Sequence, residues 1–384
     1  MILGAAVLRI LLLPLPPTLS DDVLRYVWDG RVAAAGFNPY ELPPEAGELE
    51  PLRDDLWQRL PHKEVATVYP PLALSLFAVA AQLPKSTLVL KVLLSIADLF
   101  TCWLLLMLAD HCHVARRRVL LYAWNPLVVL EVAGMGHVDA LGVLAVVLTV
   151  LLLVSRPRRS SSAAVAAAAA VLAKVVPLVA WPVWARRSAR PVVFLGIGVG
   201  ILIVTWFPVL LASGGVPSGY IRFGLSWEFN GPLYEPLWRL LERLDARSLL
   251  QSLLDGAKAV TGAHSFWNRF YPFNYPQFLA KLLLAAVSLP LFIRAWRRDD
   301  PCRATGAVFA LLILFSATVY PWYLLWVLPW AALQRRRSWL LLAALLPLSY
   351  VPQFLDVDLF PAIFCAIWLP FFIVLALERL WSAD

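Results

Sequence analysis

Two adjacent carboxylates, Asp21 and Asp22, follow directly on a short apolar segment at the start of the chain. Ser20 can cap a helix, so the spacing predicts a helix from this point to about Ala35. Acidic side chains at a membrane boundary are costly, and where they occur they usually serve a function. The pair therefore indicates a reaction site at a bilayer surface.

One face of this predicted helix combines acidic, basic and aromatic groups. At helical spacing, Asp22, Arg25, Tyr26 and Asp29 point the same way, and Trp28 lies close by. The alternative is an amphipathic interfacial helix whose acids only cap its first turn. A solvated helix would not need aromatic rings so near the carboxylates, which favours the reaction site.

Other polar and aromatic residues are expected on the same side of the membrane as these carboxylates: Tyr69, His137, Asp139, Lys174, Arg222, Trp227, Asn230 and Tyr323. Lys174 is flanked by apolar residues, where a lysine is expensive unless it meets an anion or a carboxylate. His137 could be a hydrogen-bonded structural residue or a contact to a phosphate or substrate.

The pattern His137-x-Asp139 combines two metal-ligand types, so a divalent metal stays open. The spacing is a weak signal, and we expect neither a metal nor another cofactor. The glycines of 196–200 lie in the middle of an apolar run, without the strand that a nucleotide-binding loop needs, and predict helix packing instead.

The composition is that of an integral membrane protein. The chain has 384 residues, of which 61% are hydrophobic and 15% charged, and its mean hydropathy is +0.73. Apolar runs recur along nearly its whole length, as in polytopic all-α proteins. The net charge of +8 resides in short clusters between these runs, which indicates cytoplasmic loops and not a nucleic-acid partner. The four cysteines show no CxxC spacing.

Five basic clusters fix the predicted topology, because short cytoplasmic loops carry an excess of lysine and arginine. They lie at 116–118, 156–159, 186–190, 294–298 and 335–337. With all of them inside, 69–84 cannot cross and becomes a re-entrant or interfacial helix. The segment 163–184 must then rise and return, as a broken helix with Lys174 at its apex, although one ordinary span stays an alternative.

The other predicted crossings are 1–19 (an uncleaved first helix, in which Arg9 snorkels or faces the interior), 88–110, 119–133, 138–154, 192–211, 275–293, 304–318, 322–333, 339–351 and 360–377. The total is about 12 crossings in one domain, 1–384, with both termini inside. Two long outer loops, 20–68 and 213–274, are rich in aromatics and are expected to hold the chemistry.

These features resemble the integral-membrane glycosyltransferases of the GT-C superfamily. The closest likeness is to bacterial alpha-mannosyltransferases that use polyprenyl-phosphate-mannose. The resemblance covers most of the chain and rests on the motifs at 20–31, 36–40, 62–71, 124–126, 136–139, 174–177, 227–231 and 320–323. Each motif is weak alone, but their order is fairly specific.

The resemblance implies an inverting transferase in the cytoplasmic membrane, with its active site on the outer side. Asp22, or failing that Asp21, would deprotonate an acceptor hydroxyl. Cationic groups, Lys174 first, would stabilise the departing phosphate. The implied partners are a polyprenyl-phosphate-sugar donor, with mannose the expected sugar, a glycan or glycolipid acceptor, and membrane lipids.

Two other classes of protein would also be polytopic. A flippase or transporter of lipid-linked sugars should show internal repeats and polar sites near the midplane of the membrane. We find no clear repeat, and the polar residues gather toward the outer face. A non-catalytic scaffold would not explain a buried lysine or the paired carboxylates.

Overall fold

The computed structural model describes residues 1–156, 158–273, 275–355 and 359–381. Pro157 of the second basic cluster and Asn274 at the end of the second outer loop lie outside the described residues. Within the described ranges the secondary structure is helical, apart from two isolated bridges between 229–230 and Thr318. The all-α prediction is therefore confirmed.

The α-helices follow one another as α1 (Ile2–Leu12), α2 (Asp22–Ala34), α3 (Asp55–Gln58), α4 (Pro71–Ala81), α5 (Ser86–His111), α6 (Leu120–Ala123), α7 (Pro126–Val129), α8 (Asp139–Ser155), α9 (Ser160–Ala173), α10 (Trp181–Arg187), α11 (Pro191–Ala212), α12 (Ser218–Ser226), α13 (Tyr234–Arg243), α14 (Ala246–Thr261), α15 (His264–Trp267), α16 (Pro276–Trp296), α17 (Pro301–Phe315), α18 (Leu328–Gln334), α19 (Arg337–Leu345) and α20 (Phe360–Trp381). Short helical turns join several of them, the longest being Leu346–Phe354.

Four described helices, α5, α11, α16 and α20, are long and apolar enough to cross a membrane. Five shorter apolar helices, α1, α4, α8, α9 and α17, accompany them. The protein is thus a helical membrane protein, while the predicted count of about 12 crossings stays a prediction.

The basic clusters gather at one end of the bundle. Arg118 donates to the carbonyl of Leu333, just before the last cluster, over 2.8 Å. Arg186 donates to the carbonyl of Trp296, which joins the third and fourth clusters. The thiols of Cys112, which precedes the first cluster, and Cys302, which follows the fourth, lie 3.3 Å apart. This contact connects the first and last clusters to the third and fourth. These four clusters therefore share one end of the bundle, as placing all of them on one side of the membrane requires.

The segment 160–188 folds back on itself. The Ser188 hydroxyl donates to that of Ser160 over 2.7 Å, so the start of α9 and the end of α10 lie together at the basic end. Between them the chain leaves helical geometry at Lys174, which adopts an extended backbone. Pro177 follows in a short 3-10 turn. The predicted broken helix with Lys174 at its apex is confirmed.

The segment 119–133 was predicted as one span, and this is wrong in detail. The helix stops at Trp124 and restarts at Pro126, because proline has no N–H to continue the ladder. Asn125 caps the new start by accepting from the backbone N–H of Leu127. A π-helical turn over Leu130–Gly134 then carries the chain to His137.

Arg9 faces the interior. Its guanidinium donates to Asp98 over 2.7 Å and to the carbonyls of Ala5 and Ala123. The Tyr122 hydroxyl donates to the same carboxylate over 2.5 Å. This network satisfies a buried charge, as burial inside a membrane protein requires.

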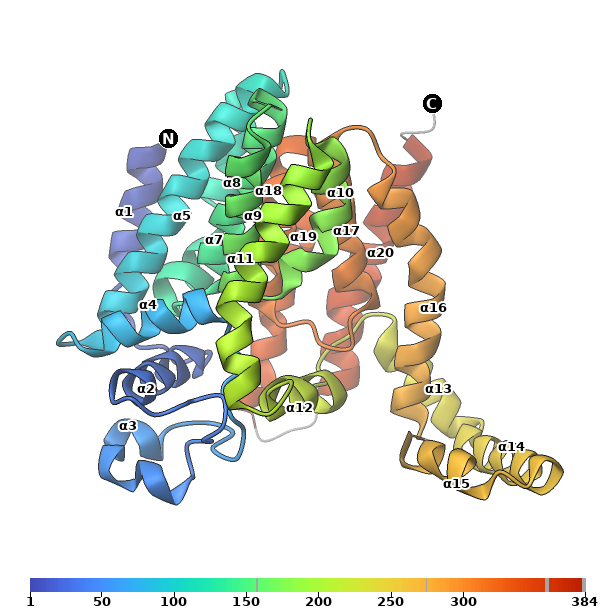
Figure 1. Cartoon of the computed structure of the whole chain (residues 1–384). Coiled ribbons are helices and arrows are strands. Elements are labelled where there is room, and N and C mark those ends of the chain that lie inside the picture. Colours follow the sequence, from blue (N-terminus) through green and yellow to red (C-terminus); the bar gives the residue numbers. More distant parts are fainter. Residues whose placement is uncertain (157, 274, 356–358, 382–384) are drawn as a thin grey trace.

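Both outer segments contain helices, α2 and α3 in the first and α12 to α15 in the second. In Figure 1, α2, α3, α12, α14 and α15 lie at the end of the molecule opposite the marked N-terminus. The helix after the paired carboxylates, α2, ends at Ala34, close to the predicted limit. The predicted re-entrant helix, α4, has 11 residues, too few to span a bilayer.

Gly30 lets α2 lie directly on α4. A Cβ at this position would come within 2.3 Å of the backbone oxygen of Phe77. Gly30→Ala should push the two helices apart and lower the free energy of unfolding by about 1–3 kcal/mol, as overpacking does. Gly47→Ala is the matched control, because a Cβ there meets nothing within 4 Å. The comparison is made on the thermal unfolding midpoints in detergent; equal midpoints for the two variants would contradict the close contact.

Candidate functional site

A cavity of about 1010 Å³ opens between the outer helices and the bundle. Asp21, Asp22 and His62 lie on one side of it, and Lys174 lines it from the hairpin apex. Apolar residues of α17 and α20, among them Phe309 and Phe364, form another part of the wall. The lining thus combines charged groups with apolar side chains, which suits an amphipathic ligand.

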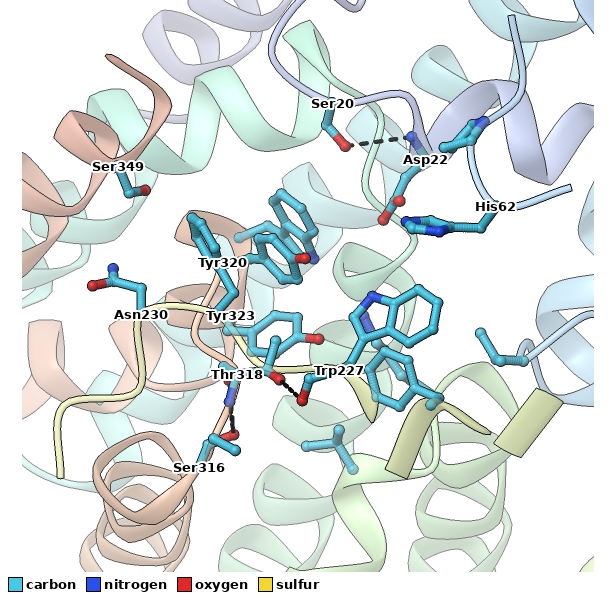
Figure 2. Close-up of a pocket in the computed structure, with 18 of the residues that line it drawn as sticks. Ser20, Asp22, His62, Trp227, Asn230, Ser316, Thr318, Tyr320, Tyr323 and Ser349 are labelled. Carbon is cyan, nitrogen blue, oxygen red and sulfur yellow. Dashed lines mark hydrogen bonds between the residues drawn. The ribbon is translucent and has the colours of Figure 1, made fainter. Parts of the chain in front are cut away.

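Eight of the twelve residues that the sequence predicted for the site line this cavity: Asp21, Asp22, Arg25, Tyr69, Lys174, Trp227, Asn230 and Tyr323. Figure 2 shows Asp22, Trp227 and Tyr323 around the space. The other four do not line it: Asp29, His137, Asp139 and Arg222. Three of these four support lining residues from behind, and Arg222 does not.

Asp22 is the best-placed acidic group. Its backbone N–H donates to the Ser20 hydroxyl (Figure 2), which holds the first turn of α2. The Tyr26 hydroxyl lies 3.4 Å from its carboxylate, one helical turn further on. Nδ1 of His137 lies 3.6 Å from the same carboxylate oxygen. Asp22 keeps an exposed fraction of 32%, so it is both supported and accessible.

The surroundings of Asp22 favour its ionised form. Burial raises the pKa of this carboxyl, but His137, Lys174 and Tyr26 outweigh the burial and hold the pKa below its ordinary value of 3.8. Burial raises the pKa of Asp21, and Arg59 only partly offsets that effect. Asp22 is therefore the stronger candidate for a group that must be ionised before it acts.

Asp29 holds the Arg25 guanidinium in place. Asp29 accepts from Nε of Arg25 over 2.8 Å. The other Arg25 nitrogens donate to the carbonyls of His62 and Val65, so the guanidinium is engaged as a brace. Asp29 is buried, and this burial outweighs Arg25 and raises the pKa of its carboxyl.

Asp139 positions Lys174. The Lys174 ammonium donates to this fully buried carboxylate over 2.7 Å. The indole N–H of Trp326 donates to the other carboxylate oxygen over 2.6 Å. The Tyr323 ring lies 5.2 Å from the ammonium, within cation-π range. The Lys174 ammonium thus donates one of its three N–H groups to Asp139, and the side chain still lines the cavity.

Glu131 was not predicted as a site residue, yet it supports His137. Its carboxylate lies 3.2 Å from Nε2 of His137 and accepts from the Tyr350 hydroxyl over 2.9 Å. Gly136 makes possible the turn that directly precedes His137: its φ is +80°, and a Cβ there would approach the Lys91 side chain at 2.9 Å. The sequence signal was weak, because Glu131 sits in an ordinary apolar run.

Four rings stack in a column, of which Trp322, Tyr320 and Phe229 line the cavity and His137 lies behind them. His137 stacks on Trp322 at 3.9 Å between ring centroids. Trp322 stacks on Tyr320 at 4.5 Å, and Tyr320 on Phe229 at 4.7 Å. The column fixes the His137 ring and so fixes the contact that His137 makes with Asp22.

The wall around Asn230 is made by two segments that are far apart in the chain. The Thr318 hydroxyl donates to the carbonyl of Trp227 over 2.7 Å (Figure 2), and the Val319 N–H donates to that of Phe229. The indole N–H of Trp368 donates to the Asn230 side-chain oxygen over 2.9 Å. The amide of Asn230 is thereby oriented at the cavity.

Arg222 points elsewhere. Its guanidinium pairs with Glu64 at 3.1 Å, and both side chains are more than a third exposed. Such exposed pairs contribute about 0–1 kcal/mol. Arg222→Ala should therefore leave the catalytic rate within about twofold of the wild-type rate. A tenfold loss, measured on a variant with an unchanged unfolding midpoint, would return Arg222 to the site.

Among the described residues, no group of three or more histidine, cysteine, aspartate or glutamate side chains is placed to hold a metal ion. In the pattern His137-x-Asp139, the two side chains have different partners. His137 lies between Asp22 and Glu131, whereas Asp139 pairs with Lys174.

Two comparisons with known proteins bear on this site. Residues 5–190 match the family model described as the N-terminal domain of alpha-(1->6)-mannopyranosyltransferases. Over 345 residues, the chain is 29% identical to Alpha-(1->6)-mannopyranosyltransferase A of Mycobacterium tuberculosis (strain ATCC 25618 / H37Rv). That alignment covers 84% of this chain and 63% of the relative, so the chain spans somewhat less than two thirds of the relative's length.

The matched family region contains Asp22, His137, Asp139 and Lys174, whereas Asn230 and Tyr323 lie beyond it. Asp22 and Lys174, which line the cavity, and His137 and Asp139, which support them, thus belong to the part of the chain that carries the match. The resemblance to mannosyltransferases inferred from the motifs is confirmed: the chain is similar to the alpha-(1->6)-mannopyranosyltransferases.

Proposed function

We propose that this protein is an inverting mannosyltransferase that moves mannose from a polyprenyl-phosphate donor to a glycan or glycolipid acceptor. One observation carries the proposal: a single cavity joins an accessible Asp22, a lysine held at a hairpin apex, and an extended apolar wall. A lipid-linked sugar phosphate needs all three. The similarity to alpha-(1->6)-mannopyranosyltransferases supports mannose as the sugar.

In the proposed reaction, Asp22 accepts the proton of an acceptor hydroxyl. The oxygen attacks the anomeric carbon of mannose from the face opposite the phosphate. A new C–O bond forms as the bond to the phosphate oxygen breaks, and its electron pair leaves with the polyprenyl phosphate. Because attack and departure occur on opposite faces, an alpha-linked product requires a beta-linked mannosyl phosphate donor.

Lys174 stabilises the negative charge that develops on the leaving phosphate. It lines the same cavity as Asp22, and Asp139 holds its ammonium from the protein side. A charge placed in advance, where water is excluded, acts more strongly than the same charge in bulk solvent. Arg25 has a different part: its donors are engaged with the protein, and it holds the end of the first outer segment in place.

The orientation of the protein follows from its charge distribution. All five basic clusters lie at one end of the bundle and the paired carboxylates lie in the outer segments. The positive-inside rule therefore favours a site on the outer face of the cytoplasmic membrane. The site would meet donors and acceptors there and not nucleotide sugars in the cytoplasm.

The test uses the purified, full-length protein in liposomes. Beta-mannosyl polyprenyl phosphate and short mannosides are supplied, and products are analysed for linkage and anomeric configuration. We expect a new alpha-mannosyl bond and no transfer from a nucleotide-sugar donor. Movement of the donor between leaflets without a new glycosidic bond would overturn the proposal in favour of a transporter.

A further inference from the structure

A second, smaller cavity of about 200 Å³ adjoins the first. It lies between α16 and α17, with Tyr234 of α13 at its edge. Lys281, Leu312, Ser316 and Ala317 line both cavities, so the two spaces meet at these residues. In Figure 1, α16 stands at the side of the bundle, away from α1 and α5.

The lining of this cavity comes from one stripe of α16. Leu284, Ala285, Ser288 and Phe292 follow Lys281 at intervals of three, four, seven and eleven residues. These are the intervals at which side chains share a helix face. The stripe is apolar except for one hydroxyl, and at 1.5 Å per residue it extends about 16 Å along α16 from the lysine.

Lys281 is the one charged residue of α16 before Arg294. Its ammonium donates to the carbonyl of Leu225 over 2.6 Å and pairs with Glu228 at 2.9 Å. The Tyr234 ring lies 5.9 Å away. A lysine in an apolar helix is costly, and these contacts place it where the two cavities meet and not at the helix surface.

We propose that the stripe of α16 and the facing residues of α17 hold the first isoprene units of the donor, with Lys281 contacting its phosphodiester. The inference rests on the proposed function and names the part of the protein that recognises the lipid. Two features favour a polyprenyl phosphate as the occupant of this channel. A cation at one end of an apolar channel matches a phosphate with a hydrocarbon tail, and the channel runs into the cavity that holds Asp22.

The arrangement also assigns a role to Glu228. In the donor-free structure its carboxylate neutralises Lys281. A phosphodiester arriving in the groove would take over one of the ammonium contacts. Glu228→Gln removes the carboxylate charge that competes with the phosphate for Lys281. This variant should therefore not raise the KM for the donor.

The decisive variants are Ala285→Phe, which fills the channel, and Ala286→Phe as the matched control. Ala286 is the next residue of α16; both alanines are exposed, but only Ala285 lines the cavity. Each is assayed with a long polyprenyl phosphate mannose and with methyl phosphate mannose, which has the phosphodiester but no isoprene unit and so does not enter the channel. Ala285→Phe should raise the KM for the long donor about tenfold and leave that for the methyl donor within about twofold.

Lys281→Met should instead raise the KM about tenfold for both donors, because both carry the phosphate. The double variant Lys281→Met with Glu228→Gln avoids leaving an unpaired carboxylate and serves if the single variant does not fold. Lys281→Arg keeps the charge and should recover most of the affinity.

The outcomes separate the two proposals. If wild-type protein transfers no sugar from either donor, the proposed function fails. If it does transfer sugar, an equal effect of Ala285→Phe and Ala286→Phe on the long donor overturns the channel. An unchanged KM in folded Lys281→Met, or in the double variant, overturns the phosphate contact.

Discussion

Asp22→Asn is expected to reduce mannose transfer by about 10²–10⁴-fold while the protein still binds its donor. The amide has nearly the shape of the carboxylate, so the contact with Tyr26 and the first turn of α2 can persist. What disappears is the ability to accept a proton. The measurement is the turnover of purified variants beside their affinity for the polyprenyl-phosphate donor.

The matched variant is Asp21→Asn. Asp21 also lines the cavity, but neighbouring helix positions are about 100° apart, so the two carboxylates cannot both face the same reacting atom. We expect the smaller loss here. A dead Asp21→Asn beside a nearly normal Asp22→Asn would reverse the assignment, and normal turnover in both would remove the pair from the mechanism.

The pH profile gives an independent check. A base must be deprotonated to act, and the pKa of Asp22 is held below 3.8. Activity limited by this group is therefore present at neutral pH and is lost only as the pH falls through that lowered value. An acid limb near pH 6 would point to a different titrating group.

Lys174→Met should have two separate consequences. Removing the ammonium leaves the fully buried Asp139 carboxylate without its cation, and breaking such a buried pair costs about 3–5 kcal/mol of stability. It also removes a charge-assisted contact to the donor phosphate, worth about 1.5–3 kcal/mol, or roughly a 10- to 150-fold loss in donor use.

The double variant Lys174→Met with Asp139→Asn separates these effects. An amide at 139 is neutral and can still accept from the Trp326 indole, so the unfolding midpoint should recover. Donor use should not recover. Full transfer activity in the double variant would show that Lys174 serves only as the partner of Asp139.

Much of this arrangement could be predicted from local patterns. The hairpin at Lys174 followed from the two basic clusters that flank 163–184, because with both clusters on the inside the segment must rise and return. The position of Asp22 beside Tyr26 followed from helical spacing. Both inferences needed only neighbours in the sequence.

The remaining features depend on contacts between distant segments. His137 and Trp322 stack although 185 positions separate them, and no periodicity relates the two. Arg222 lies away from the cavity because Glu64 of another outer segment holds it. Lys281 had a signal, a lone lysine in an apolar helix, but its meaning emerged only when α17 was placed against α16.

The hairpin that carries Lys174 also determines how deep this residue lies in the membrane. From Ser160 at the basic face, α9 has 14 residues and rises about 21 Å before the lysine. The hydrocarbon core of a bilayer is about 30 Å thick. The lysine therefore stands below the far headgroup layer, and a sugar phosphate that reaches it is drawn out of bulk water. In the proposed reaction, a site at that depth would keep the anomeric carbon for the acceptor hydroxyl and suppress hydrolysis of the donor by competing water.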